Sequence, residues 1–247
     1  MDAIARTYLC NYDFNRRLIP PSKEYMLATL PRSGSTFLSL ELWRTGALGA
    51  PVEYTNEAFI GPLRQRLAVH SNKSQYWRGV KTLRTSPNGV FSYKMFMTNY
   101  LECADIDKEL LQQFSADQVV YLTRKDRLAQ AISHAKAIQT GVWYADAKSK
   151  IEPVYHYNQI KECLAMIDRQ LDFWEKLFEL TETPVHRIEY EDLLCNSSSV
   201  VTKVANFLEV EISPKSKINV PHLKVQRDSY SDDWTMRFLE EDDLHCR

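Results

Sequence analysis

Short apolar runs along the chain predict buried strands, and amphipathic segments between them predict helices. The runs are rich in aliphatic, β-branched and aromatic residues, which is typical of strands covered on both faces. They lie at 25–30, 90–95 and 118–122, and Pro184 starts a fourth predicted core strand at 185–189. Apolar residues that recur at helical spacing predict the helices. These are expected at 37–44, in two stretches within 56–86 that break near 70–72, at 98–116, from 127 to about 139, at 158–180 and at 197–207.

Strands that alternate with helices predict parallel βαβ crossovers. We therefore expect an α/β fold, with a central parallel sheet of about four to five strands and helices on both faces. Ligands of such sheets bind at the carboxyl ends of the strands. A single domain over residues 1–247 is expected, with a polar lead-in at 1–23 and an irregular C-terminal segment at 209–247.

A compact polar loop joins the first predicted strand to its helix. Pro31 ends the strand because it has no N–H for the ladder, and Arg32-Ser33-Gly34-Ser35-Thr36 follows it. A strand, a tight glycine loop and a helix N-terminus aim several N–H groups at one point, which favours a phosphate or sulfate. The alternative is a plain polar turn, capped by Ser35 or Thr36.

This loop differs from the nucleotide-binding signature G-x-x-x-x-G-K-[ST], because no lysine follows its single glycine. Its arginine offers a planar fork of donors that suits phosphate or sulfate oxygens without a metal. The sequence therefore favours an anion site of a different kind.

Composition narrows the class of protein. The 31 basic and 32 acidic residues balance, so no overall charge indicates nucleic acid or an anionic membrane. The five cysteines form no C-x-x-C, which predicts reduced thiols in a cytoplasmic protein, and the six histidines lack metal-ligand spacing, so no metal is expected. Because the sequence shows neither a signal peptide nor a run of about 20 apolar residues, we expect a soluble protein without a membrane span.

The segment Leu30–Thr36 resembles the 5′-phosphosulfate loop of sulfotransferases that use 3′-phosphoadenosine-5′-phosphosulfate (PAPS). Within that superfamily the chain is most similar to the bacterial branch that sulfates trehalose and related glycolipid sugars. Similar segments recur at 49–54, 119–143, 190–194 and 227–238. The resemblance implies a P-loop-like sulfotransferase that moves a sulfuryl group from PAPS to a hydroxyl of a carbohydrate or glycolipid. It also implies in-line transfer without a metal.

The resemblance assigns three residues to the chemistry. Arg32 is expected at the transferring group, and Ser33, Gly34, Ser35 and Thr36 are expected to bind the 5′-phosphosulfate with it. Glu53 lies in a G-x-P-x-E-[YF] segment whose glutamate is the proposed general base; the alternative is a surface glutamate after a turn. Lys94 resembles a strand-borne lysine near the acceptor, or is a salt-bridged lysine at a strand end.

The superfamily binds the 3′-phosphate with an arginine after a core strand and a serine on the next helix. Arg124 and Ser133 resemble that pair, but they are nine residues apart instead of eight. Lys125 fits the usual spacing, so either Arg124 or Lys125 is expected to hold the phosphate; the alternative is a surface turn with Asp126 as the helix N-cap. Arg227 matches a basic residue of the late loop, so the C-terminal segment is expected to close over the nucleotide.

Two other functions stay open at this point. One is a catalytically silent module that binds 3′-phosphoadenosine-5′-phosphate (PAP), and the other is a P-loop kinase or NTPase, which the missing Gly-Lys-[Ser/Thr] disfavours. Trp143 belongs to a segment that resembles the acceptor side, whereas 190–193 is expected to be structural. The resembling enzymes can form homodimers, but the sequence shows no interface and does not identify the acceptor.

Overall fold

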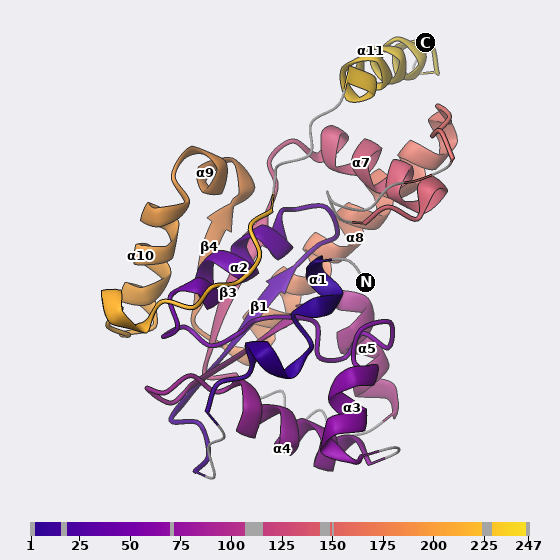
Figure 1. Ribbon diagram of the computed structural model, residues 1–247. Helices are drawn as coiled ribbons and strands as arrows, with labels where there is room; N and C mark the ends of the chain where they lie inside the picture. Colours follow the sequence, from indigo (N-terminus) through magenta and orange to yellow (C-terminus); the bar gives the residue numbers. More distant parts are fainter. Residues whose placement is uncertain are drawn as a thin grey trace.

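The computed structural model describes residues 3–15, 19–69, 72–106, 116–143, 149, 151–223 and 229–245. These residues form a four-stranded parallel sheet in the order β2-β1-β3-β4, which confirms the predicted α/β fold (Figure 1). The strands are β1 (Lys23–Thr29), β2 (Val90–Phe96), β3 (Gln118–Thr123) and β4 (Val185–Glu189).

The order of the strands places a ligand crevice at the centre of the sheet. The chain passes from β1 to the edge strand β2 and then returns to β3 on the other side of β1. Thr29, at the end of β1, pairs with Phe96 of β2 and Leu122 of β3, so the three strands end at the same level. A crevice opens where the winding direction reverses, between the carboxyl ends of β1 and β3.

Most of the predicted helices are confirmed, with shifts of a few residues at their ends. Residues 107–115, the end of the predicted 98–116 helix, lie outside the described part of the chain. The helices are α1 (Ala3–Arg6), η1 (Cys10–Tyr12, a 3-10 turn), α2 (Ser35–Arg44), α3 (Gly61–Leu67), α4 (Lys73–Arg84), α5 (Met97–Ile106), α7 (Arg127–Thr140), α8 (Tyr157–Thr181), α9 (Tyr190–Cys195), α10 (Ser197–Phe207), η2 (Pro214–Ser216, a 3-10 turn) and α11 (Ser229–His245).

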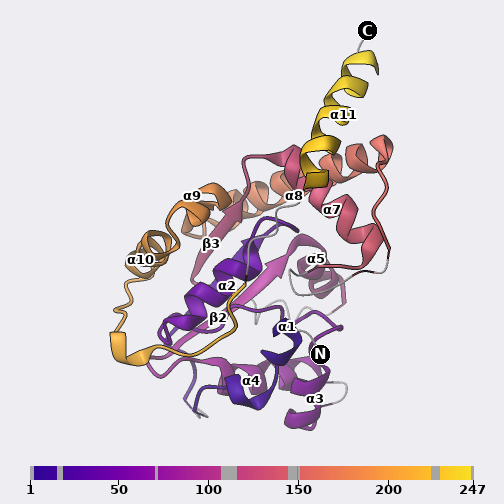
Figure 2. The same cartoon turned by 45° about the horizontal axis from the view of Figure 1, so that its top comes forward.

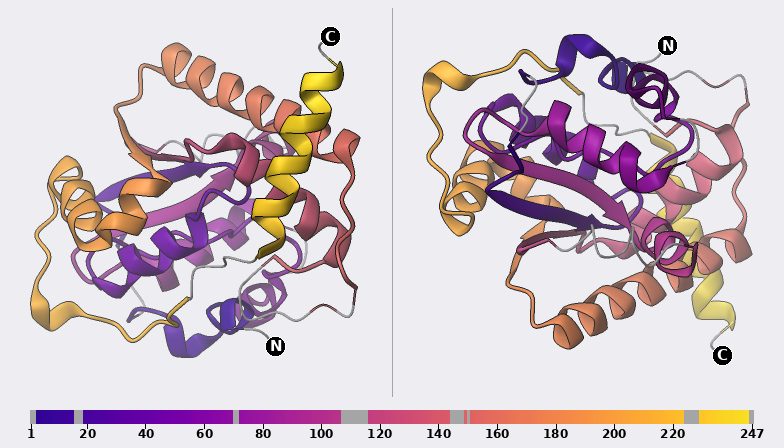
Figure 3. Two further views of the ribbon diagram at one scale, coloured as in Figure 1. Left: turned by 90° about the horizontal axis from the view of Figure 1, so that it is seen from above. Right: turned by 90° about the horizontal axis from the view of Figure 1, so that it is seen from below.

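Helices cover the two faces of the sheet, and Figure 3 shows α2 and α8 on opposite sides of it. Alternate residues of β1 point to opposite faces. Leu27 packs in an apolar cluster with residues of α2 and α10, while Ala28 belongs to a larger cluster that includes Trp174 of α8. Burial on both faces is the reason why β1, β2 and β3 are nearly continuous apolar runs.

Short polar signals set the ends of α7. The Asp126 side chain accepts a hydrogen bond from the backbone N–H of Ala129, which confirms the N-cap. Gly141 ends the helix with φ 68°, a left-handed conformation that glycine adopts without steric cost. The cap and the glycine therefore fix where α7 begins and ends.

The predicted irregular C-terminal segment is wrong for residues 229–245, which form α11. This helix packs against α7 and extends away from the sheet (Figures 1 and 2). Its apolar contacts come from Trp234, which meets Tyr155 edge to face at 5.8 Å, and Phe238, which stacks on Tyr157 at 5.0 Å. Two aromatic anchors among many acidic residues make too sparse a pattern to predict a helix, so tertiary packing decides.

The N-terminal lead-in contributes to the core, although its composition is polar. Ile4, Tyr8 and Phe14 are buried in the larger apolar cluster. The backbone N–H of Phe14 donates to the carbonyl of Leu83, and fully buried Arg84 lies 3.1 Å from a carboxylate oxygen of Asp13. These contacts fasten the lead-in to α4.

None of the described helices is both long and apolar enough to cross a membrane.

Candidate active site

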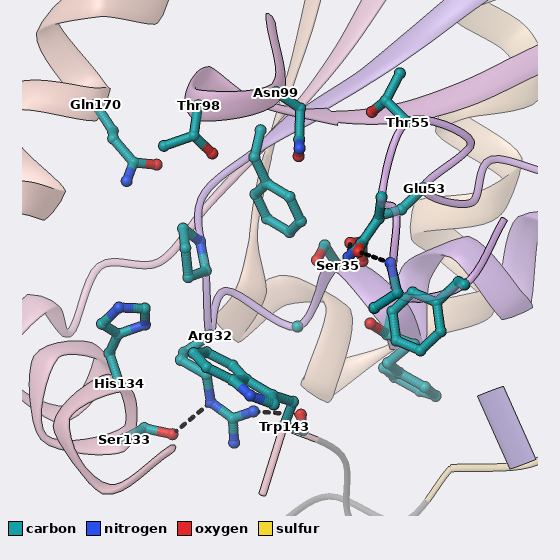
Figure 4. Close-up of a pocket in the computed structure, with 18 of the residues that line it drawn as sticks. Arg32, Ser35, Glu53, Thr55, Thr98, Asn99, Ser133, His134, Trp143 and Gln170 are labelled. Carbon is teal, nitrogen blue, oxygen red and sulfur yellow. Dashed lines mark hydrogen bonds between the residues drawn. The ribbon is translucent and has the colours of Figure 1, made fainter. Parts of the chain in front are cut away.

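A cavity of about 840 Å³ lies at the carboxyl ends of the strands. Its wall takes residues from the segments that directly follow all four strands: Pro31 after β1, Thr98 after β2, Arg124 after β3 and Tyr190 after β4. This is the edge at which parallel α/β sheets bind ligands. Figure 4 shows part of the lining.

The loop after β1 is folded by its own hydroxyl groups. Ser33 is fully buried; its hydroxyl donates to the Leu30 carbonyl at 2.8 Å and shares a 2.7 Å hydrogen bond with Thr29. The Ser33 side chain therefore shapes the loop and is absent from the described cavity lining, while Gly34, Ser35 and Thr36 line the cavity as predicted.

Gly34 allows a close contact that no other residue would tolerate. Its φ is 82°, and a Cβ atom added to it would lie 2.3 Å from Cδ2 of Tyr190. The Tyr190 ring thus covers the loop, and the guanidinium of Arg124 lies 5.1 Å from the centre of that ring. A tyrosine expected to be structural is therefore part of the cavity wall.

Arg32, Arg124 and Ser133 converge on the cavity. The Nε atom of Arg32 donates to the hydroxyl of Ser133 at 2.9 Å, and its guanidinium also donates to the Trp143 carbonyl (Figure 4). Arg124 donates to the backbone carbonyl of Arg32 at 3.4 Å. Two arginines and the N-terminus of α2 at one loop make this end of the cavity suitable for anionic groups.

Glu53 and Lys94 form a buried ion pair beside the loop. Nζ of Lys94 lies 2.8 Å from Oε1 of Glu53, and the two residues are 4% and 7% exposed, respectively. Lys94 also donates to the hydroxyl of Thr36 at 3.2 Å, and the side-chain amide of Asn56 donates to Oε2 of Glu53 at 2.6 Å. Both carboxylate oxygens are thus held, and Lys94 links the carboxylate to the loop.

The backbone of Glu53 is fixed by the N-terminal lead-in. The Tyr8 hydroxyl accepts a hydrogen bond from the Glu53 N–H at 3.1 Å and donates one to the Glu53 carbonyl at 3.3 Å. One residue earlier, the Val52 carbonyl accepts from the backbone N–H of Lys94 at 3.0 Å. The segment that carries Glu53 is therefore held between the lead-in and β2.

Among the predicted site residues that the structure describes, Lys125 lies outside the cavity lining. The ammonium group of Lys125 pairs with Glu189 on the surface, and this hydrogen bond together with the carboxylate charge raises the pKa of Lys125. Between the two candidates for the 3′-phosphate, the structure thus places Arg124 in the described lining and Lys125 outside it. Arg227 lies outside the described residues.

Sequence reasoning missed His134 and Gln170, which both line the cavity. Burial and then the charge of Arg32 lower the pKa of His134 to about 4, so its imidazole is neutral at physiological pH. Gln170 is 3% exposed and lies on the buried face of α8 between Ile167 and Trp174. The sequence signal that could have identified Gln170 is a polar residue within an otherwise apolar helix stripe.

The cavity combines anion-binding groups with a buried carboxylate. Such a site can hold an anionic donor at the loop and accept a proton from a neighbouring hydroxyl at Glu53. Among the residues that the structure describes, no three His, Cys, Asp or Glu side chains group together as metal ligands would.

Several known proteins are similar to this chain. The family model described as Stf0 sulphotransferase matches residues 24–241. A protein named trehalose 2-sulfotransferase from Mycolicibacterium smegmatis is 25% identical, covering 87% of this chain and 93% of its own length. A protein of the same name from Mycobacterium tuberculosis is also 25% identical, and the match covers 89% of this chain and 95% of that protein. A solved sulfotransferase domain from the curacin biosynthetic pathway has 17% identity and a TM-score of 0.49, with 80% of this chain and 77% of that chain covered.

Proposed function

The chain belongs to the Stf0 sulphotransferase family and is a sulfotransferase; from this premise we propose that it transfers the sulfuryl group of PAPS in line to a hydroxyl of a carbohydrate or glycolipid, with Glu53 as the general base. The observation that carries the proposal is that four residues of the loop, together with Arg124 and Glu53, line one cavity; the four are Arg32, Gly34, Ser35 and Thr36. The names of the two trehalose 2-sulfotransferases support a sugar acceptor.

The residues at the anionic end fit a nucleotide with two phosphate positions. The backbone of Gly34–Thr36, the α2 N-terminus and Arg32 would hold the 5′-phosphosulfate. Arg124 and Ser133 would hold the 3′-phosphate. One observation supports the fit: Nε of Arg124 is buried without a hydrogen-bond partner among the described residues. PAPS supplies the sulfuryl group when it is bound.

The side chains around Glu53 have complementary roles in this proposal. Glu53 would accept the proton that the acceptor hydroxyl loses as its oxygen bonds to sulfur, while the bond from sulfur to the 5′-phosphate oxygen breaks and PAP leaves. Lys94 holds the carboxylate in place, and it also contacts Thr36 of the loop. The cations at Arg32 and Lys94 stabilise negative charge that develops at the loop.

The test is calorimetry with PAP followed by transfer of label from PAPS to trehalose, glucose, a glycolipid and a phenol. We expect PAP to bind and a sugar to be labelled. Glu53→Gln should bind PAP within about twofold of the unmodified protein and lose about 100-fold or more in kcat, as is usual when a general base is removed. Glu179→Gln, on the exposed part of α8, is the matched control and should be unchanged.

Two results would overturn the proposal. Absence of heat with PAP removes the nucleotide assignment, and full activity of Glu53→Gln removes the base. A silent PAP-binding module would bind PAP without labelling any acceptor. That alternative requires the Glu53 side chain to lie away from the anion site, whereas it lines the same cavity.

A further inference from the structure

The segment that follows β4 contacts the turn that follows β3. The two strands are neighbours in the sheet, and Thr123 at the end of β3 pairs with Glu189 at the end of β4. The helix α9 begins directly after β4, beside this edge of the sheet (Figure 1). We call residues 189–191 the β4–α9 junction and residues 124–126 the β3–α7 turn.

Glu191 of the junction binds the backbone of the turn with both of its carboxylate oxygens. Oε2 accepts a hydrogen bond from the N–H of Lys125 at 3.1 Å, and Oε1 accepts one from the N–H of Asp126 at 3.3 Å. These N–H groups lie at the N-terminal end of α7, where a negative charge is favourable. Because hydrogen bonds to a charged acceptor are stronger than neutral ones, Glu191 fixes the backbone directly after Arg124.

The other two residues of the junction bind side chains of the same turn. The carboxylate of Glu189 pairs with the ammonium group of Lys125, and the ring centre of Tyr190 lies 5.1 Å from the guanidinium carbon of Arg124. The pair between Lys125 and Glu189 is largely exposed to solvent, so it contributes little. The two hydrogen bonds of Glu191 are therefore the stronger polar link between the junction and the turn.

The Arg124 side chain depends on this backbone for its direction. Its guanidinium donates to the carbonyl of Arg32 at 3.4 Å, beyond the usual length of a hydrogen bond. Its Nε atom is buried without a hydrogen-bond partner in the described part of the chain. A shift of about 1 Å in a binding group is enough to weaken its action strongly. The position of the turn therefore decides whether Arg124 meets a phosphate in the cavity.

We propose that Glu191 is a positioning residue for the 3′-phosphate site, because it holds the β3–α7 turn so that Arg124 faces the phosphate. The inference rests on the proposed function. Glu191 is absent from the described cavity lining, so it acts through Arg124 and not by touching the nucleotide. The junction, expected from the sequence to be only structural, thereby takes part in distinguishing nucleotides with a 3′-phosphate from those without one.

Positioning and a plain effect of charge predict opposite results. A carboxylate near an anion site repels the anion, so on charge alone Glu191→Gln would strengthen the binding of PAP. Positioning predicts weaker binding, because glutamine offers an acceptor to one N–H and turns its own NH₂ donor toward the other. Asp192→Asn removes the same charge at the exposed next residue without changing a contact to the turn, so it is the matched control.

The test is calorimetry with PAP and with adenosine 5′-monophosphate, which lacks the 3′-phosphate. We expect Glu191→Gln to weaken PAP binding about fivefold and Glu191→Ala about tenfold or more, as the loss of one and then two hydrogen bonds implies. The Kd of adenosine 5′-monophosphate should change by no more than about twofold, and Asp192→Asn should leave both nucleotides within the same limit. Thermal unfolding checks that each variant is folded; if Glu191→Ala is not, Glu191→Gln decides.

A double variant tests whether Glu191 acts through Arg124. Arg124→Gln alone should weaken PAP binding about tenfold or more, because a charged contact to the phosphate is lost. Adding Glu191→Gln to it should change the Kd of PAP by no more than about twofold, since the group that Glu191 positions is already gone. A merely structural role would weaken binding by the same factor with and without Arg124.

The outcomes separate the inference from the proposed function. Unchanged or tighter PAP binding in Glu191→Gln, with the unmodified protein binding PAP, overturns the inference and leaves the sulfotransferase proposal intact. Equal losses for both nucleotides, or independent losses in the double variant, also overturn it. If Arg124→Gln binds PAP normally, the 3′-phosphate assignment falls and the inference with it. If the unmodified protein gives no heat with PAP, the donor assignment itself falls.

Discussion

The ammonium nitrogen of Lys94 lies 2.8 Å from Oε1 of Glu53, and both side chains are buried. Replacing Lys94 with methionine leaves a buried carboxylate without its charge partner, which typically costs about 3–5 kcal/mol. We expect the free energy of unfolding of Lys94→Met, measured by urea denaturation, to fall by about this amount. The double variant Lys94→Met/Glu53→Gln should lose clearly less, because no unpaired charge is then buried. Equal losses in the single and double variants would show that the pair is not coupled.

The Tyr8 hydroxyl holds Glu53 through two backbone hydrogen bonds, so Tyr8→Phe should loosen the proposed base without removing any group from the cavity. We expect a loss of about 1–2 kcal/mol in unfolding free energy and a severalfold drop in kcat, because small displacements of a reacting group slow catalysis. Tyr12→Phe, from the same lead-in, is the control. Identical kcat values for the two variants would contradict the positioning role.

Gly34→Ala should damage both the loop and its grip on the nucleotide. The added Cβ would meet the Tyr190 ring at 2.3 Å, and φ of 82° is unfavourable for alanine. We expect a loss of about 1–3 kcal/mol in stability and at least tenfold weaker PAP binding by calorimetry. Gly61→Ala is the matched control, since nothing lies within 4 Å of its added Cβ. Normal PAP binding by Gly34→Ala would show that the loop does not touch the phosphates.

His134 should make stability depend on pH below neutrality. Its pKa is about 4 in the folded protein, compared with an ordinary value of 6.5, so between these values the unfolded chain binds the proton more readily. Stability is therefore fully present above about pH 6.5 and falls as the pH drops toward 4. For a partly exposed side chain we expect a loss of about 1–2 kcal/mol.

The measurement is urea denaturation at several pH values, for the unmodified protein and for His134→Gln. The variant carries no titrating group at this position, so it should lose less stability across the same interval. Parallel curves for the two proteins would mean that His134 titrates normally.

Strands β1, β2 and β3 were predictable because each is short, mostly apolar and buried on both faces. The run at 118–122, for example, falls inside β3 (Gln118–Thr123). The loop after β1 was predictable from local backbone preferences, because Pro31 ends the strand and Gly34 permits a left-handed turn. The helix α11 was not, because Trp234 and Phe238 stabilise it only through contacts with residues about 80 positions earlier.

Parts of the site were also beyond local reasoning. Arg124 and Lys125 are neighbours in sequence, and only the direction of their side chains separates the one that lines the cavity from the one that pairs with Glu189. The positions of Tyr190 over Gly34 and of Tyr8 beside Glu53 depend on how distant segments pack. No spacing rule in a single sequence encodes such contacts.

The N-terminal lead-in holds the Glu53 backbone, so it matters when this enzyme is compared with its relatives. The family match begins at residue 24, whereas Tyr8 and Asp13 precede it. Relatives compared only over their shared core would look alike at the glutamate even where this anchoring had been lost or replaced. Sequence changes upstream of the common segment can therefore shift the carboxylate that we propose as the base, while the motif around Glu53 stays the same.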